Sequence, residues 1–167
     1  MATNLATIEK REASAASKLL AAFLLGGAAF GIDAQFVEEV VKVGDITQVS
    51  HAPSCVVGIR NLRGRIVTVI DLRALLDLVA VPPSPDNRIL IVDLRGEQLG
   101  LLVDSVADTI SANAEDMAPP PSNLHGVQGR NLQGVCRGGG RLVAVLNLNS
   151  LLQAEDPEGA TTPSRRA

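Results

Sequence analysis

Short apolar runs separated by turn signals make up the middle of this chain. Eight runs of strand length, rich in Val, Ile and Leu, are bounded by glycine-containing turns; they are KLLAAFLL, AAFGI, VVGIRNL, RIVTVIDL, NRILIVDL, QLGLLVDSV, LQGVC and RLVAVLNL. Runs of this length and composition predict β-strands joined by hairpins. Leucines at helical spacing in residues 71–78 and 147–153 predict two short helical turns. The pattern therefore predicts an all-β fold with short helical turns.

The chain also contains an internal repeat. Aligned without a gap, residues 58–76 and 134–152 are identical at eight of nineteen positions: Gly58/Gly134, Gly64/Gly140, Arg65/Arg141, Val67/Val143, Val69/Val145, Leu72/Leu148, Leu75/Leu151 and Leu76/Leu152. A weaker similarity between residues 29–41 and 98–110 aligns two further pairs, Gly31 with Gly100 and Val37 with Val106. Such self-similarity indicates two copies of one unit, each about the size of an SH3-like barrel. We expect two pseudo-repeated SH3-like subdomains, because closing each sheet removes exposed strand edges.

Prolines mark the boundary that we predict between the two subdomains. Residues 81–87, VPPSPDN, carry three prolines, which cannot serve interior strands. The segment is therefore predicted to be a linker between a first barrel at 18–80 and a second at 88–152. Both ends, 1–17 and 153–167, lack apolar periodicity and are predicted to be mobile tails.

The apolar stretch at 19–32 admits a signal-sequence interpretation, because basic residues precede it. Three features favour a hairpin instead. Glu9 and Glu12 are interleaved with the basic residues, the apolar run starts late, and Gly26-Gly27 interrupts it where a turn would lie. The run is also too short to span a bilayer. We expect a cytoplasmic protein with no direct membrane insertion.

Composition and charge exclude a nucleic-acid partner and indicate a reducing compartment. The net charge is −3, and the chain has no Trp or Tyr and only three Phe residues on which bases could stack. Cys55 and Cys136 lie far apart and belong to no CxxC or Cys/His cluster. They are predicted to be reduced, buried thiols, with a long-range disulfide as the alternative.

The sequence offers no catalytic or metal-binding constellation. His51 and His125 are the only histidines, and neither has a Cys, His or carboxylate at ligand spacing. Asp71 and Asp93 follow strand patterns and are predicted to make local turn bonds. The run CRGGGR at 136–141 lacks the Gly-Lys-Ser/Thr ending of a phosphate loop and is predicted to be a hairpin turn. We expect no enzyme activity, no metal and no cofactor.

One arginine calls for a functional interpretation. In the repeat, Arg63-Gly64 overlies Gly139-Gly140, so turn geometry does not require the arginine. Glu39 is its candidate charge partner, in a segment VEEVV that would place Val37 beside Val40 if it formed a helical turn. The alternative is a solvated surface arginine.

Four segments resemble the CheW family. NLRGRIVTVIDLR (61–73) is similar to the family's NLRG-hydrophobic-DLR signature, and FLLGGAAFGID (23–33) to its opening hairpin. VEEV (37–40) and GLLVDSVADTI (100–110) are similar to its V-x-E-V/I and G-hydrophobic-VD-x-V elements. The chain departs from the family at four positions, Ala28, Ala29, Ser105 and Asn147.

The resemblance implies two five-stranded barrels with an apolar groove between them. In that family the helical tip of a chemoreceptor docks in the groove, and the barrel ends pair with the regulatory domain of a CheA-type histidine kinase. The residues so implied for the receptor-binding groove are Val37, Glu39, Val40, Gly58, Arg63, Gly64, Val103 and Val106. Among them Glu39 and Arg63 would form an ion pair, and Val103 is equally well explained as barrel core. Kinase-binding residues are not assigned.

The resulting hypothesis is a non-catalytic adaptor linking chemoreceptors to a CheA-type kinase. An alternative within the family is a paralogue that serves a twitching, gliding or other non-flagellar array. A small-molecule-binding double barrel is disfavoured by the lack of aromatics and convergent polar groups. A fragment of the kinase itself is disfavoured because the chain has no room for its phosphotransfer and ATP-binding domains.

Overall fold

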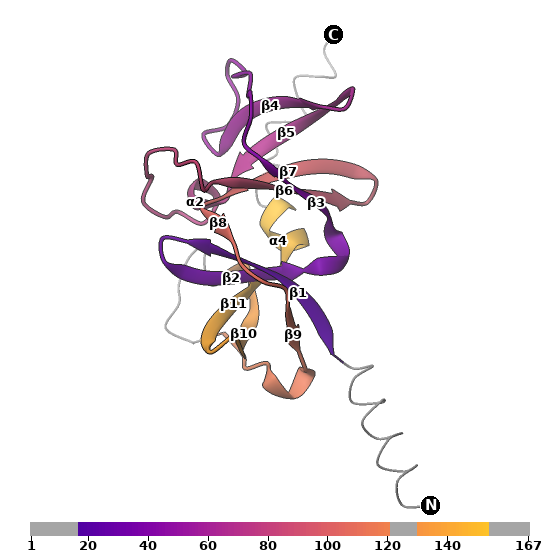
Figure 1. Cartoon of the computed structure of the whole chain (residues 1–167), viewed down its shortest axis with the longest axis vertical. Helices are drawn as coiled ribbons and strands as arrows, with labels where there is room; N and C mark the ends of the chain where they lie inside the picture. The colour runs from indigo at the N-terminus through magenta and orange to yellow at the C-terminus, as the bar shows by residue number, and fades with distance from the viewer. Residues whose placement is uncertain (1–16, 121–129, 154–167) are drawn as a thin grey trace, which may run out of the picture.

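Two β-sheets and two short α-helices make up the computed structural model, which describes residues 17–120 and 130–153 (Figure 1). The strands are β1 (Lys18–Leu25), β2 (Ala28–Asp33), β3 (Val37–Lys42), β4 (Val56–Leu62), β5 (Arg65–Asp71), β6 (Arg88–Leu94), β7 (Glu97–Val103), β8 (Ser105–Val106), β9 (Ile110–Ala112), β10 (Leu132–Gly138) and β11 (Arg141–Leu146). The helices are η1 (Ala34–Phe36), α2 (Leu72–Leu75), η2 (Ala114–Asp116) and α4 (Leu148–Gln153). The all-β prediction and both helical turns are confirmed.

Each sheet forms a small barrel. Barrel B contains five strands in the order β3-β6-β7-β5-β4. Barrel A contains β10-β11-β2-β1, and its last edge position is shared by β8 and β9, which both pair with β1. Figure 1 shows barrel B above barrel A, with α4 between them.

The division of the chain into barrels differs from the predicted boundaries at 18–80 and 88–152. Barrel A takes β1 and β2 from the first part of the chain and β8 to β11 from the second, and barrel B likewise draws strands from both parts. The exchange occurs through two parallel pairings, β5 with β7 and β11 with β2. In each copy of the repeat, the first hairpin therefore joins a sheet completed by the other copy. The segment 81–87 contains no strand, as predicted. It does not link the two barrels, because β5 before it and β6 after it both belong to barrel B.

The repeat predicted from sequence has a structural counterpart in how each barrel closes. In barrel B, Thr47 forms an antiparallel bridge with Ile59, and in barrel A, Ala118 forms one with Val135. Ile59 and Val135 are equivalent in the repeat, and each follows a glycine at a β-bulge. The two copies thus bend and close by the same device.

Three apolar clusters stabilise the fold. One cluster lies inside barrel A around Val143 and Val145, and another lies inside barrel B around Val67 and Val69. The largest lies between the barrels and includes residues of both sheets and both α-helices: Phe23, Leu25, Ile32, Cys55, Ile70, Leu72, Leu75, Leu76, Leu90, Val92, Leu101, Val103, Leu146, Leu148 and Leu151. We call this set the inter-barrel core. It fixes the barrels relative to each other.

The stretch at 19–32 forms the β1–β2 hairpin, as predicted, with Gly26 and Gly27 both at positive φ in the turn. The same two-residue turn recurs at Arg63-Gly64 and Gly139-Gly140, where both residues again have positive φ. Within the part of the chain that the structure describes, there is no helix long and apolar enough to cross a membrane. The predicted tails and His125 lie outside the described residues, except for Ser17 and Gln153 at their margins.

Candidate functional site

The valines predicted to line a groove come from strand β3, not from a helical turn. The pairing of β3 with β6 shifts register between Val37 and Glu39, so that Val37 pairs with Val92 and Val40 with Leu90. Paired residues of neighbouring strands point to the same face of a sheet. Since Val92 and Leu90 belong to the inter-barrel core, the bulge places both valines of β3 on that face. The two valines do share a face, for a different reason than predicted.

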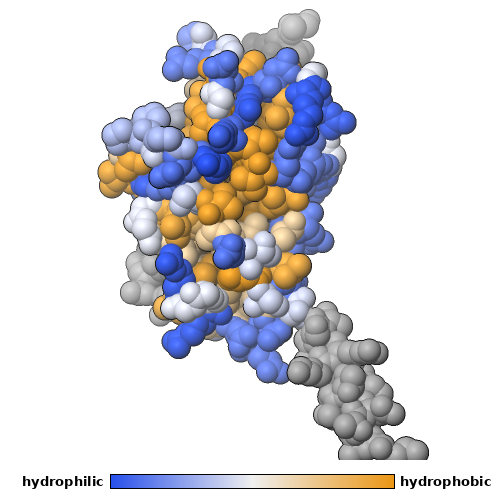
Figure 2. All heavy atoms as spheres, viewed as in Figure 1, coloured by the Kyte–Doolittle hydropathy of each residue, from blue (hydrophilic) through white to orange (hydrophobic). Residues whose placement is uncertain are grey.

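Val106 reaches the same region from barrel A. It pairs with Phe23, a member of the inter-barrel core that is fully buried. Val40 is 44% exposed and Val106 is 38% exposed, so each lies where the inter-barrel core meets solvent. Figure 2 shows an apolar band over the face on which Figure 1 draws β3 and β8. We call the surface of Val37, Val40 and Val106 the seam.

Val103, the fourth valine of the predicted groove, lies in the core. Its side chain is 1% exposed and packs in the inter-barrel core. A docked segment cannot contact it without opening that core, so the structure favours the core interpretation over the groove interpretation.

Arg63 and Glu39 form the predicted ion pair beside the seam. Arg63 Nη1 donates to Glu39 Oε1 at 2.8 Å, and Nη2 lies 2.7 Å from Oε2. The arginine side chain is 74% exposed and the glutamate side chain 27% exposed. The hydrogen bond and the charge of Glu39 raise the pKa of Arg63. The guanidinium keeps its charge, and most of its surface is free for a partner.

The ion pair also joins the two edges of barrel B. Glu39 belongs to β3 and Arg63 to the β4–β5 turn, and β3 and β4 are the edge strands of that sheet. Arg60 of β4 makes a second link of this kind by donating from Nη1 to the carbonyl of Lys42 in β3. Because backbone contacts also close the barrel, the exposed pair is one of several links and not the sole closure.

Gly58 and Gly64, predicted as groove residues, have roles in the backbone. A Cβ on Gly58 would lie 2.3 Å from the carbonyl oxygen of Thr47, and φ at Gly58 is +156°. Gly134, its equivalent in the repeat, approaches the carbonyl oxygen of Ala118 in the same way. Gly64 occupies the second turn position with a φ of +86°, and no described atom lies within 4 Å of the position that its Cβ would take. Gly58 is therefore assigned to barrel closure, and Gly64 to the turn that presents Arg63.

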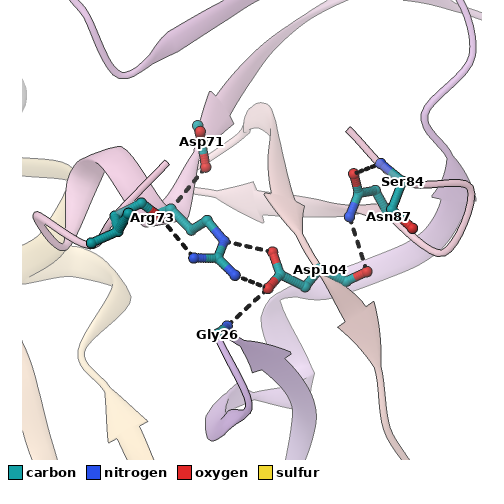
Figure 3. Close-up of polar contacts among 7 residues, drawn as sticks. Gly26, Asp71, Arg73, Ser84, Asn87 and Asp104 are labelled. Carbon is teal, nitrogen blue, oxygen red and sulfur yellow. Dashed lines mark hydrogen bonds and ion pairs between the residues drawn. The ribbon is translucent and has the colours of Figure 1, made fainter. Parts of the chain in front are cut away.

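A second ion pair, between Arg73 and Asp104, was missed by the sequence analysis (Figure 3). Arg73 lies in α2 and is 8% exposed. Its Nε donates to Asp104 Oδ1 at 2.7 Å. The same guanidinium donates from Nη1 to the carbonyl of Val79, and the Asp104 carboxylate accepts from Gly26 N–H, both at 2.8 Å. The pair thus ties α2, the segment after it, the β1–β2 turn and the end of β7 together. Both residues lie in segments that resemble family motifs, which was the available signal.

The family model described as "CheW-like domain" matches residues 20–156. The chain belongs to the CheW-like domain family. It is 30% identical to the chemotaxis protein CheW of Rhizobium meliloti over 84% of this chain and 91% of that protein. It is 33% identical to the CheW of Treponema pallidum over 82% of this chain and 83% of that protein.

A solved structure supports the same assignment for the CheW-like fold. The scaffolding protein TtCheW of Thermoanaerobacter tengcongensis is 32% identical and superposes with a TM-score of 0.73, covering 80% of this chain and 91% of that chain. Protein FrzA of Myxococcus xanthus is 28% identical over 78% of this chain and 82% of that protein.

The remaining chemistry-bearing residues of this CheW-like chain play local roles. Asp71 accepts a hydrogen bond from Arg73 N–H, and Asp93 accepts one from Gly96 N–H, so both make the predicted local bonds. Cys55 and Cys136 form no disulfide and are buried in different apolar clusters, and burial raises the pKa of the Cys136 thiol. Within residues 17–120 and 130–153, no three His, Cys, Asp or Glu side chains gather as metal ligands would.

Acid should weaken this CheW-like fold through Asp104. The Arg73 hydrogen bond, opposed by partial burial and supported by Gly26 N–H, holds the pKa of Asp104 below its ordinary value of 3.8. A carboxyl of this kind stabilises the fold above its unfolded pKa, and that contribution is lost as the pH falls through the lower folded pKa. We expect the urea midpoint of the wild type to fall between about pH 5 and about pH 2, and that of Asp104→Asn to fall less. If the urea midpoints of the wild type and of Asp104→Asn fell equally with pH, this role of Asp104 would be contradicted.

Proposed function

We propose that this CheW-like protein is a chemotaxis adaptor that binds the helical tip of a chemoreceptor on the seam and the regulatory domain of a CheA-type histidine kinase elsewhere on the barrels. The observation that carries the proposal is the seam itself. Val40 and Val106 come from different barrels, yet both remain exposed on the face of the inter-barrel core. The Arg63–Glu39 pair stands at the β3 side of this surface.

An amphipathic helix suits such a surface. A helix that docks by its apolar face needs aliphatic contacts at its centre and polar groups at the rim. The seam supplies the exposed valines Val40 and Val106, and β3 also carries the charged residues Glu38, Glu39 and Lys42. A receptor helix whose polar residues meet these charges would be held in one register.

The proposed mechanism is geometric and requires no reaction. An adaptor that holds receptor and kinase together raises the effective concentration of each for the other. The state of the receptor then reaches the kinase through differences in affinity between the two bound states. By this proposal the protein acts in the cytoplasm, at membrane-associated receptor arrays, and its two partners are proteins.

The alternative is a CheW-like adaptor that serves a twitching, gliding or other non-flagellar array. The similarity to FrzA of Myxococcus xanthus supports keeping it. The seam would serve either array in the same way, so the choice depends on which receptors the protein binds. Affinity for receptor fragments from flagellar and non-flagellar gene clusters of the source organism distinguishes the two.

The Arg63–Glu39 pair provides the test of this function. We expect Arg63→Ala and Glu39→Ala each to weaken binding of a receptor-tip fragment or of the kinase regulatory domain, while the urea midpoint changes little because Arg63 is exposed. The double variant should lose less binding free energy than the sum of the two single variants, because each change removes the same interaction. Affinities are measured by calorimetry for both partners.

Arg95→Ala is the matched control for this experiment. Arg95 occupies the first position of a turn of the same kind, at a φ of 57° compared with 52° for Arg63, and it forms no ion pair with any residue that the structure describes. Its replacement should leave both affinities unchanged. Unchanged affinities for both partners in Arg63→Ala would contradict a role for the pair in binding.

A further inference from the structure

A pocket with two compartments opens at one end of barrel A. Its apolar compartment, of about 220 Å³, is lined by Leu20, Ala112, Met117 and Val145. Its second, more polar compartment, of about 200 Å³, is lined by Gln35, Asn147 and Asn149 together with Phe36, Leu146 and Leu148. The two compartments share Lys18, Asp33 and Gln133. Volumes of this size suit part of a small molecule, with an apolar group in one compartment and charged groups in the other.

The two charges of this pocket lie in it without pairing with each other. Lys18 and Asp33 both line each compartment, but among the described residues they form no ion pair. The Asp33 carboxylate accepts hydrogen bonds from Gln35 N–H at 3.1 Å and from Gln35 Nε2 at 3.0 Å. A carboxylate has acceptor sites beyond these two, and the lysine ammonium has three donors. The pocket therefore offers one positive and one negative group to a ligand.

The related pocket of barrel B shows that the fold does not require this arrangement. That pocket, of about 300 Å³, is lined by Arg73 and Asp104, whose opposite charges neutralise each other in an ion pair. Leu102 lies two residues after Gly100, as Asp33 lies two residues after Gly31, and the two glycines face equivalent valines in the parallel pairings. Barrel B thus has a leucine at the equivalent position. In barrel A the Asp33 carboxylate caps η1 by accepting from Gln35 N–H, and it keeps further acceptor sites for a ligand.

The same comparison applies to Gln133. It is the bulged residue before Gly134, and its equivalent before Gly58 is Val57, which packs against the core of barrel B. At positions 33 and 133, barrel A therefore carries polar residues where barrel B carries apolar ones. Residues 18, 33, 133 and 147 are distant in sequence, which is why the sequence showed no convergent polar groups.

We propose that this pocket of barrel A binds a small zwitterion with an aliphatic side chain, such as an apolar amino acid. The aliphatic group would occupy the compartment of Leu20, Ala112 and Val145. The carboxylate of the ligand would pair with Lys18, and its ammonium group would pair with Asp33. Asp33 is partly buried and Lys18 is exposed, and a ligand that carries both charges would pair with each of them through a charge-assisted hydrogen bond. This site is separate from the seam and its proposal does not depend on the adaptor function.

Calorimetric titration of the full chain with L-leucine tests the proposal. We expect saturable binding of leucine, with affinity at least tenfold weaker for 4-methylpentanoate, which lacks the ammonium group, and for leucine amide, which lacks the carboxylate. Lys18→Met and Asp33→Asn should each weaken leucine binding at least tenfold. Ala112→Leu should abolish it, because the added carbons would fill the apolar compartment.

Matched controls separate the site from general effects of charge or folding. Lys42→Met and Asp45→Asn change exposed residues outside the pocket and should leave leucine binding unchanged. Circular dichroism and the urea midpoint show whether each variant is folded. If Ala112→Leu does not fold, Lys18→Met still tests the site. No saturable binding of leucine by the wild type would overturn the proposal. Equal affinity for 4-methylpentanoate, or an unchanged affinity in Asp33→Asn, would also overturn it.

Discussion

Asp104→Ala is expected to lower the free energy of unfolding by about 3 kcal/mol, because it leaves the Arg73 guanidinium buried without its counter-charge. Arg73 is 8% exposed, and Asp104 is its only carboxylate partner in an ion pair among the described residues. The change also removes the acceptor of Gly26 N–H in the β1–β2 turn. The side chain of Asp104 is 25% exposed, which places the expected loss at the lower end of the range for buried pairs.

Urea unfolding followed by circular dichroism measures this loss. Asp108→Ala is the control, because Asp108 is an exposed carboxylate in the same segment and makes no ion pair in the described part of the chain. It should change the free energy of unfolding by less than about 0.5 kcal/mol. An Asp104→Ala variant as stable as Asp108→Ala would show that the pair contributes nothing to the fold.

Gly58→Ala should also destabilise the protein strongly, by about 3 kcal/mol, although Gly58 was predicted to lie in the receptor-binding groove. The new Cβ would lie 2.3 Å from the carbonyl oxygen of Thr47, and a backbone atom cannot move aside as a flexible side chain can. The clash would open the Thr47–Ile59 bridge that closes barrel B. The loss is measured from the urea midpoint and slope.

Gly64→Ala is the matched control for the backbone argument. Gly64 also has positive φ, at +86°, but no atom lies within 4 Å of the position of its Cβ. Its replacement should cost about 1 kcal/mol, the ordinary penalty for placing a side chain in this conformation. If Gly58→Ala were no less stable than Gly64→Ala but bound the receptor fragment weakly, Gly58 would belong to the binding surface after all.

Sequence reasoning predicted the elements of this fold well and their assembly poorly. The strands β2, β5 and β11 begin where the apolar runs begin, because a two-residue turn ending in glycine directly precedes each of them. The exchange of strands between the two copies was not predicted. It depends on the parallel pairings of β5 with β7 and of β11 with β2, and a local pattern of apolar residues does not specify its distant partner.

Only part of the candidate site was predicted, because contacts between residues distant in sequence are not visible in local patterns. Comparing the two copies singled out Arg63, since only one copy carries an arginine in the turn, and the resemblance to the CheW family implied its ion pair with Glu39. The bulge in β3 was missed because VEEVV fits a helical turn and a bulged strand equally well. The Arg73–Asp104 pair joins residues 31 positions apart across two elements, and no periodicity connects such residues.

The seam between the barrels is expected to bind a receptor helix, and a titration followed by NMR tests this binding most directly. The isotope-labelled protein is titrated with a helical fragment of a chemoreceptor's cytoplasmic tip from the source organism. We expect the largest shift changes in β3 and β8, and at least tenfold weaker binding for Val40→Asp and Val106→Asp. Val49→Asp is the control, because Val49 and Val40 are both 44% exposed and Val49 lies outside the seam. Shift changes confined to other surfaces, or unchanged affinity in both seam variants, would contradict the claim.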